Sequence, residues 1–233
     1  MKFPRADAYP LPFVRENMMG PSSLVILEEL TRNLPLRNGM KVLDWGCGRG
    51  LTSVFLAKEF GVSVTALDLW IPAEENEARF RETGVADRVT AVCGDGAQVS
   101  FEKESFDAVV SVDAYHYAGF RPGFFREHIR PFLKAGALVA LAFPGRRKDE
   151  PVPPEMVPFW NGEEAEMIQP ACRWRDLLSG EIGGLRVEEM SCFDRAWLDW
   201  VACENPYAAE DRLMMAAGGD RFLNLLAVTG RAV

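Results

Sequence analysis

The sequence predicts an α/β fold built on a mostly parallel sheet, and two observations lead to that prediction. From residue 40 onward, short apolar or β-branched segments alternate with segments of helical pattern. Most of these apolar segments are continuous, as expected of strands that are covered on both faces. Such alternation favours parallel strands joined by right-handed crossovers. A chain of 233 residues suffices for a single domain of this kind.

The elements are expected in the following order. Residues 1–20 are rich in proline and aromatic residues and are predicted to form a mobile arm or lid, and a helix then starts at Pro21. The expected strands are Lys41–Trp45, 63–67, Val89–Cys93, Phe106–Val112, 137–143, 185–193 and 222–229. Helices are expected at 51–60, 72–83, 122–133 and 172–179. Residues 144–184 read as a Pro-rich insertion near the ligand side, and 194–221 as a helical segment.

Composition narrows the class of protein. The formal charge is −8 and no basic run exceeds three residues, which disfavours binding to nucleic acid. There is no apolar run long enough for a membrane span. The five cysteines form no C-x-x-C pair, so neither a metal site nor a disulfide framework is expected. We therefore expect a cytoplasmic protein, monomeric or homodimeric, that acts on small molecules without a metal.

A glycine-rich loop follows the first strand. The segment VLDWGCGRG ends its apolar run at Asp44 and then carries Gly46, Gly48 and Gly50. Glycine lets the backbone turn sharply and approach a ligand closely. The acidic residue disfavours a phosphate, and Leu51 breaks the G-x-G-x-x-G spacing of dinucleotide sites. The loop therefore favours a nucleoside ligand that carries cationic groups, such as S-adenosylmethionine.

Polar residues also follow the next three strands. Asp68 closes the second strand, where a carboxylate is placed to accept hydrogen bonds from ribose hydroxyls. Asp95 and Gly96 follow the third strand and are suited to bind an adenine edge. The segment 111–117, SVDAYHY, spans the end of the fourth strand. Since open α/β sheets bind ligands at the carboxyl ends of their strands, one site is predicted from all four elements.

The chain resembles class I S-adenosylmethionine-dependent methyltransferases of the bacterial small-molecule type. The resemblance rests on VLDWGCGRG, VTALDLW, CGDGAQVSF, FDAVVSVDAYHY and PFLKAGALVALAFPG. It implies a Rossmann-like, seven-stranded, mostly parallel sheet of order 3-2-1-4-5-7-6, with the last strand antiparallel and helices on both faces. It also implies S-adenosyl-L-methionine as the cofactor.

The resemblance further implies a role for each cofactor-binding position. Gly46, Gly48 and Gly50 would pass under the methionine part, and Asp44 would orient this loop and contact the amino group through water. Asp68 would bind the ribose, and Leu69 or Trp70 would pack on the adenine. Asp95 and Gly96 would read the adenine edge, and Ser111 would lie beside the sulfonium.

The sequence says less about the residues that would contact the methyl acceptor. Methyl transfer is an in-line displacement, so a general base matters only for an acceptor that is protonated at neutral pH. His116 is the candidate base because the ordinary pKa of histidine lies near neutrality, although a structural role is equally open. Tyr115 and Tyr117 are candidates to line the acceptor pocket or to hydrogen-bond the acceptor.

The sequence thus predicts a methyltransferase with a small-molecule acceptor. One alternative is a non-catalytic, S-adenosylmethionine-binding or regulatory protein of the same fold. Another is an NAD(P)-dependent oxidoreductase, but its glycine spacing and a catalytic Tyr-Lys pair are missing from the sequence. No N-P-P-Y tetrapeptide follows the fourth strand, which disfavours methylation of DNA or glutamine amino groups. The acceptor atom stays open among nitrogen, oxygen, sulfur and carbon.

Overall fold

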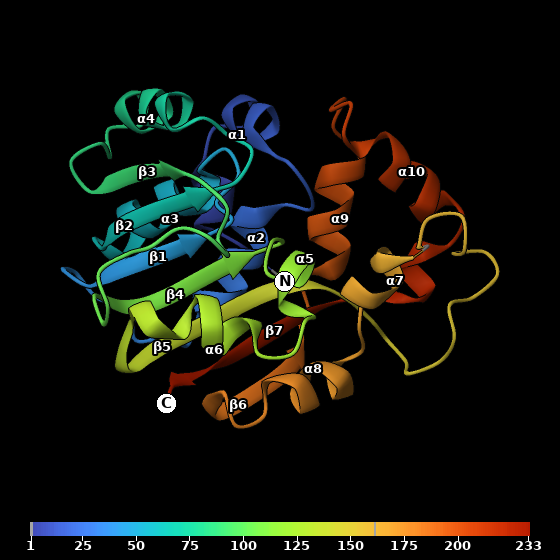
Figure 1. The fold of residues 1–233 in the computed structure, drawn as a ribbon. Helices are drawn as coiled ribbons and strands as arrows, with labels where there is room; N and C mark the ends of the chain where they lie inside the picture. Colours follow the sequence, from blue (N-terminus) through green and yellow to red (C-terminus); the bar gives the residue numbers. More distant parts are fainter. Residues whose placement is uncertain (1, 161) are drawn as a thin grey trace.

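The computed structural model describes residues 2–160 and 162–233. Its centre is a seven-stranded sheet of order β3-β2-β1-β4-β5-β7-β6 (Figure 1). The first five strands run parallel, whereas β7 is antiparallel to both β5 and β6. The strands are β1 (Lys41–Trp45), β2 (Ser63–Asp68), β3 (Val89–Cys93), β4 (Phe106–Val112), β5 (Leu133–Arg146), β6 (Ile182–Glu189) and β7 (Leu223–Ala232). The predicted fold, strand order and antiparallel last strand are confirmed.

Successive side chains of each central strand point to opposite faces of the sheet, and both faces are buried in hydrophobic clusters. In β1, Val42 joins one hydrophobic cluster and Leu43 joins the other. In β4, Val110 and Val109 divide in the same way. Continuous apolar strands are the sequence signature of this double burial. The sheet is therefore a rigid platform whose strand ends can present a site.

Helices cover the two faces. The longer ones are α2 (Ser23–Thr31), α3 (Leu51–Phe60), α4 (Ala73–Glu82), α8 (Ala171–Leu178), α9 (Phe193–Val201) and α10 (Ala208–Ala216). Shorter ones are α1 (Leu11–Asn17), α5 (His116–Gly119), α6 (Phe124–His128) and α7 (Glu163–Met167), together with the 3-10 turns at Ala6–Ala8, Arg130–Phe132 and Gly219–Arg221. Figure 1 shows α5, α7, α9 and α10 gathered toward the side to which β4 points. The site is expected on this side of the sheet.

The N-terminal arm is packed, in contrast to the mobile arm predicted for 1–20. It contains α1, and Phe3, Val14 and Met18 are buried in the core. The Ala6 N–H donates to Glu28 Oε2 over 2.8 Å, and Asn205 Nδ2 donates to the Met18 carbonyl over 2.9 Å. Proline and aromatic residues suggested a loose segment, but the aromatic side chains are apolar area that the fold buries.

Other boundaries also differ from the prediction, since β5 and β7 are longer than expected and β6 starts and ends earlier. The single helix expected at 122–133 is replaced by α6 and a 3-10 turn, because Gly123 adopts a left-handed conformation and Pro131 cannot continue a helix. The Pro-rich insertion expected at 144–184 is shorter, since β5 continues to Arg146 and β6 starts at Ile182. The expected helical segment 194–221 is present as α9, α10 and a 3-10 turn.

Candidate active site

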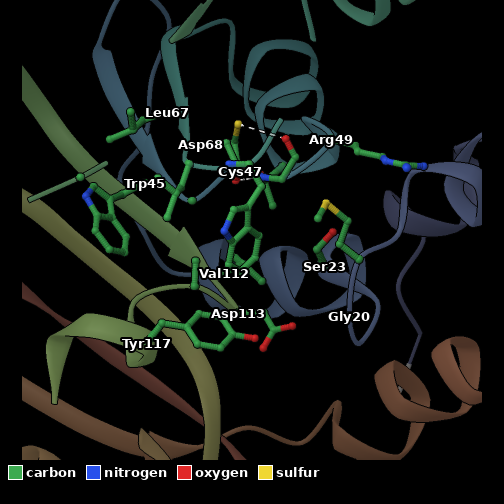
Figure 2. Close-up of a pocket in the computed structure, with 18 of the residues that line it drawn as sticks. Gly20, Ser23, Trp45, Cys47, Arg49, Leu67, Asp68, Val112, Asp113 and Tyr117 are labelled. Atoms are coloured by element: carbon green, nitrogen blue, oxygen red, sulfur yellow. Dashed lines mark hydrogen bonds between the residues drawn. The ribbon is translucent and has the colours of Figure 1, made fainter. Parts of the chain in front are cut away.

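A cavity of about 270 Å³ opens at the carboxyl ends of β1, β2, β3 and β4 (Figure 2). Its described lining comes from five segments, among them the N-terminal arm, and includes Met19, Gly20, Trp45, Gly46, Cys47, Gly48, Arg49, Thr52, Asp68, Leu69, Trp70, Asp95, Gly96, Asp113, Ala114 and Tyr117. Its walls are mostly apolar, with a few polar groups that converge on the space, as is common in ligand sites. Six of the nine predicted cofactor-binding residues line it: Gly46, Gly48, Asp68, Leu69, Asp95 and Gly96.

The glycine loop folds as the spacing predicts. Gly46, Gly48 and Gly50 have φ values of +78°, +54° and +77°, which favour glycine at all three positions. A side-chain carbon built on Gly46 would lie 2.2 Å from Ala114 Cβ. Gly50 does not line the cavity; it precedes α3 and packs against Phe80. The loop thus brings its backbone against the cavity at Gly46 and Gly48.

Asp44 lies behind the loop and outside the cavity lining. Its Oδ2 accepts hydrogen bonds from Thr52 Oγ1 and Ser53 Oγ, each over 2.6 Å, and this ties β1 to the first turn of α3. The side chain is fully buried, and its Oδ1 has no hydrogen-bond partner among the described residues. Burial raises the pKa of Asp44 to about 6, although the two hydroxyl groups partly offset this. Asp44 therefore orients the loop through the helix and does not face the ligand space.

Asp68 organises the loop from the neighbouring strand. Its Oδ2 accepts from the Gly48 N–H over 2.7 Å, and its Oδ1 accepts from the N–H groups of Trp70 and Ile71 over 2.9 and 3.1 Å. A carboxylate offers roughly four acceptor positions, two on each oxygen. One position on Oδ2 is left in this arrangement. Asp68 can therefore accept one further hydrogen bond from a ligand, whereas the sequence suggested two.

The turn after β3 forms another wall. Asp95 Oδ1 accepts from the Ala97 N–H over 2.9 Å and Oδ2 accepts from Gln98 Nε2 over 2.8 Å, so the side chain stabilises its own turn. A carbon built on Gly96 would lie 2.5 Å from the Trp45 indole ring. The buried Trp45 Nε1 has no hydrogen-bond partner among the described residues. The turn thus lies directly on Trp45, with backbone exposed toward the cavity at Gly96.

Asp113 lines the opposite wall and was not predicted as a site residue. It follows β4 with a φ of +57°, a conformation that costs most non-glycine residues about 1–3 kcal/mol and that Asp tolerates better than most. Its N–H donates to the Ala142 carbonyl over 2.7 Å. Burial, and secondarily the charge of Asp211, raise the pKa of Asp113 to about 8. A strained and desolvated carboxyl group in a cavity wall is typical of a functional residue.

The predicted acceptor-side residues lie in different places. Tyr117 lines the cavity, and its ring meets that of Trp70 edge-on at 6.1 Å. Tyr115 is fully buried among Phe124, Phe143 and Trp174, outside the cavity lining. Its position is that of a core residue, and its side chain does not line the cavity.

His116 and Ser111 also lie outside the lining. His116 is 5% exposed, and burial lowers its pKa to about 3, so the ring is a weak base at neutral pH. Ser111 is fully buried within β4.

The sequence held a signal for Asp113, although this residue was not predicted as a site residue. Asp113 follows β4 in the same way that Asp95 follows β3.

Comparison with known proteins identifies the segment that builds most of this cavity. Residues 42–136 match the model of the methyltransferase domain family. This segment is a methyltransferase domain. It contains the glycine loop, Asp68, the Asp95–Gly96 turn and Asp113, whereas Met19 and Gly20 reach the cavity from outside it.

Relatives of this methyltransferase domain act on different acceptors. Sterol 24-C-methyltransferase of Gibberella zeae is 34% identical over 110 residues, which are 47% of this chain and 29% of the relative. Sarcosine/dimethylglycine N-methyltransferase of Aphanothece halophytica is 31% identical over 102 residues, 43% of this chain and 37% of the relative. The matches thus span less than two fifths of either relative.

A solved structure matches the methyltransferase domain together with most of the rest of the chain. Geranyl diphosphate methyltransferase in complex with S-adenosylmethionine superposes with a TM-score of 0.73, over 91% of this chain and 86% of that one, at 20% identity. At this identity the likeness establishes the shared fold.

Two further observations concern the described residues. None of their helices combines the length and apolarity that a membrane crossing requires, and they contain no cluster of three or more His, Cys, Asp or Glu suited to a metal ion.

Proposed function

We propose that this protein transfers a methyl group from S-adenosylmethionine to a small-molecule acceptor. One observation carries the proposal: the glycine loop, Asp68 and the Asp95–Gly96 turn line a single cavity at adjacent strand ends. The matched methyltransferase domain contains all three elements. Cavity size and wall chemistry suit a nucleoside with a short charged tail.

The residues present fit the cofactor. Glycine is required where the wall is tightest, since a side chain on Gly46 or Gly96 would collide with Ala114 or Trp45. Leu69 is 53% exposed at the cavity, as is needed for packing on an adenine ring. Asp68 would accept one ribose hydroxyl at the free position on Oδ2, while its other bonds hold the loop.

The methionine end of the cofactor would lie by the glycine loop and the start of α3. Thr52 in the first turn of α3 lines the cavity, and the positive end of the helix dipole favours a carboxylate there. Arg49 is the one basic residue among the described lining residues, but its Nη1 donates to the Glu16 carbonyl over 2.8 Å, so its guanidinium group faces the N-terminal arm. The start of α3 is therefore the feature that would stabilise a free α-carboxylate.

Methyl transfer requires correct alignment of the acceptor with the methyl donor more than it requires reactive side chains. When bound, the cofactor supplies an electrophilic methyl group on a positively charged sulfur, and an acceptor atom must lie in line with that bond. The rigid strand ends would hold the cofactor, and the arm residues Met19 and Gly20 narrow the space left for the acceptor.

We place the protein in the cytoplasm, as its five cysteines form no disulfide among the described residues.

Calorimetric titration tests this function. We expect S-adenosylhomocysteine and S-adenosylmethionine to bind one per chain, and NADH not to bind. Asp68→Ala should abolish binding while the folded state survives, whereas Asp87→Ala, at an exposed carboxylate away from the cavity, should bind as the wild type does. If neither cofactor form binds to the folded protein, the proposal is wrong.

A further inference from the structure

Among the described residues, three carboxylates line the cavity, and one of them differs from the others. Asp68 accepts three backbone hydrogen bonds, and Asp95 accepts one from a backbone N–H and one from Gln98. Among the hydrogen bonds and ion pairs described for residues 2–160 and 162–233, none involves the carboxylate of Asp113. Two of the three are therefore occupied in holding loops, while Asp113 is left to a ligand.

The backbone and the arm fix the position of this carboxylate. The hydrogen bond from the Asp113 N–H to the Ala142 carbonyl anchors it to β5, and its positive φ turns the residue away from the strand direction. A carbon built on Gly20 would lie 2.1 Å from Asp113 Oδ2, so the arm packs directly on the carboxylate. The next residue, Ala114, contacts the position of Gly46 in the glycine loop. Asp113 is thus beside the methionine end of the cavity, where the transferable methyl group would lie.

The surroundings of Asp113 are negative and aromatic. Asp211 of α10 raises the pKa of Asp113, and Asp113, Asp211 and Glu164 of α7 all contribute to raising the pKa of Tyr117 after burial. Figure 2 shows the Tyr117 ring and Asp113 on one side of the cavity and Cys47 and Asp68 on the other. A cation in this space would be attracted by the carboxylates and by the ring face of Tyr117.

We propose that the acceptor is a compact amine, which enters as an ammonium cation and places an N–H group on the Asp113 carboxylate. This inference rests on the proposed methyltransferase function and names its substrate class. Asp113 takes a proton from the ammonium group, which frees the nitrogen lone pair. The nitrogen then forms a bond to the methyl carbon while the carbon–sulfur bond breaks, and its electron pair stays on sulfur. The products are S-adenosylhomocysteine and a methylated ammonium ion.

A pair of probes that differ in one atom tests the inference. In N,N-dimethylethanolamine the cationic N–H group replaces the C–H group of 3-methylbutan-1-ol, and the two molecules have nearly the same shape. Binding of each to protein saturated with S-adenosylhomocysteine is measured by NMR chemical-shift titration near pH 8. We expect the cation to bind at least about tenfold more tightly, because its charge-assisted hydrogen bond to Asp113 has no counterpart in the uncharged alcohol.

The variant Asp113→Asn keeps the shape of the side chain and removes its charge. We expect it to lower the preference for the cation below about threefold, while affinity for S-adenosylhomocysteine stays unchanged. Asp176→Asn, at an exposed carboxylate on α8, is the matched control and should keep the full preference. Equal binding of the probes, binding of neither, or a preference that survives in Asp113→Asn would overturn the inference. If S-adenosylhomocysteine itself does not bind, the proposed function fails instead.

Discussion

The backbone of Gly20 lies directly against the carboxylate of Asp113. A single carbon added to Gly20 would approach Asp113 Oδ2 to 2.1 Å, far below van der Waals contact. The contact joins the N-terminal arm to the residue that follows β4, across 93 positions of the sequence. Any function of Asp113 therefore depends on an arm that lies outside the matched methyltransferase domain.

Substitution of this glycine tests that dependence. Gly20→Ala should force the Asp113 side chain or the arm to move, and we expect kcat/KM for the acceptor to fall by about tenfold or more. Affinity for S-adenosylhomocysteine should change by less than about threefold, because Asp68 and the glycine loop are untouched. Steady-state kinetics measures kcat/KM, and calorimetry on the same sample measures the affinity for S-adenosylhomocysteine. Equal losses of kcat/KM and of this affinity would indicate that the arm serves cofactor binding instead.

Asp113 should reduce stability at neutral and alkaline pH. Its folded pKa is raised from 3.8 to about 8, so the carboxylate must be ionised at a cost in the folded state as pH rises from about 4 to about 8. Asp113→Asn removes this cost, and Asn tolerates the left-handed backbone at least as well. We expect a higher thermal midpoint than wild type at about pH 9, and no gain below about pH 4. A variant less stable than wild type at alkaline pH would show that the carboxylate has a hidden partner.

The Asp44 network should be sensitive to pH in a narrower window. Ser53→Ala removes one of two donors to a fully buried carboxylate and should destabilise the fold by about 1–3 kcal/mol at pH 7.5. Below about pH 6 the folded-state carboxyl group becomes protonated, so the loss should shrink. Urea denaturation at pH 7.5 and about pH 5 provides the comparison. An equal loss at both pH values would mean that Asp44 is not ionised in the folded protein at pH 7.5.

His116 should affect acid stability and leave the pH profile of turnover unchanged. Its folded pKa lies near 3, below the ordinary 6.5, so folding stability is lost as pH falls from about 6.5 toward 3. His116→Gln should remove this part of the acid sensitivity, measured by urea denaturation at pH 7 and about pH 4.5. The kinetic pH profile should keep its shape, because Asp113 is the proposed proton acceptor. Loss of the acidic limb, on which activity rises as the base becomes deprotonated, would restore His116 as the base.

Local patterns in the sequence suffice to predict the sheet and most of the strand-end residues that line the cavity. Each of Gly46, Gly48, Asp68, Asp95 and Gly96 follows or ends a strand, so strand direction alone brings them to one edge. The tight backbone at Gly46 and Gly96 explains why those positions carry glycine.

The cavity wall that follows β4 depends on contacts that no local pattern encodes. The sequence predicts acceptor-side roles for Tyr115, His116 and Tyr117 in the segment 111–117, but none for Asp113. The left-handed turn at Asp113 sets which of these side chains face the cavity. It directs Tyr115 and His116 into the core and leaves Asp113 and Tyr117 at the wall. The arm needed Asn205, near the other end of the chain, to fix its place by a hydrogen bond.

The most direct test of the account is methyl transfer itself. Protein is incubated with S-adenosylmethionine labelled in its methyl group and with two matched pools of small molecules, one of primary to tertiary amines and one of alcohols, phenols, thiols and carboxylates. We predict labelled product in the amine pool, equal in amount to the S-adenosylhomocysteine formed, and little from the other pool. Labelled product confined to the second pool would contradict the amine acceptor, and no labelled product in either would contradict methyl transfer to a small molecule.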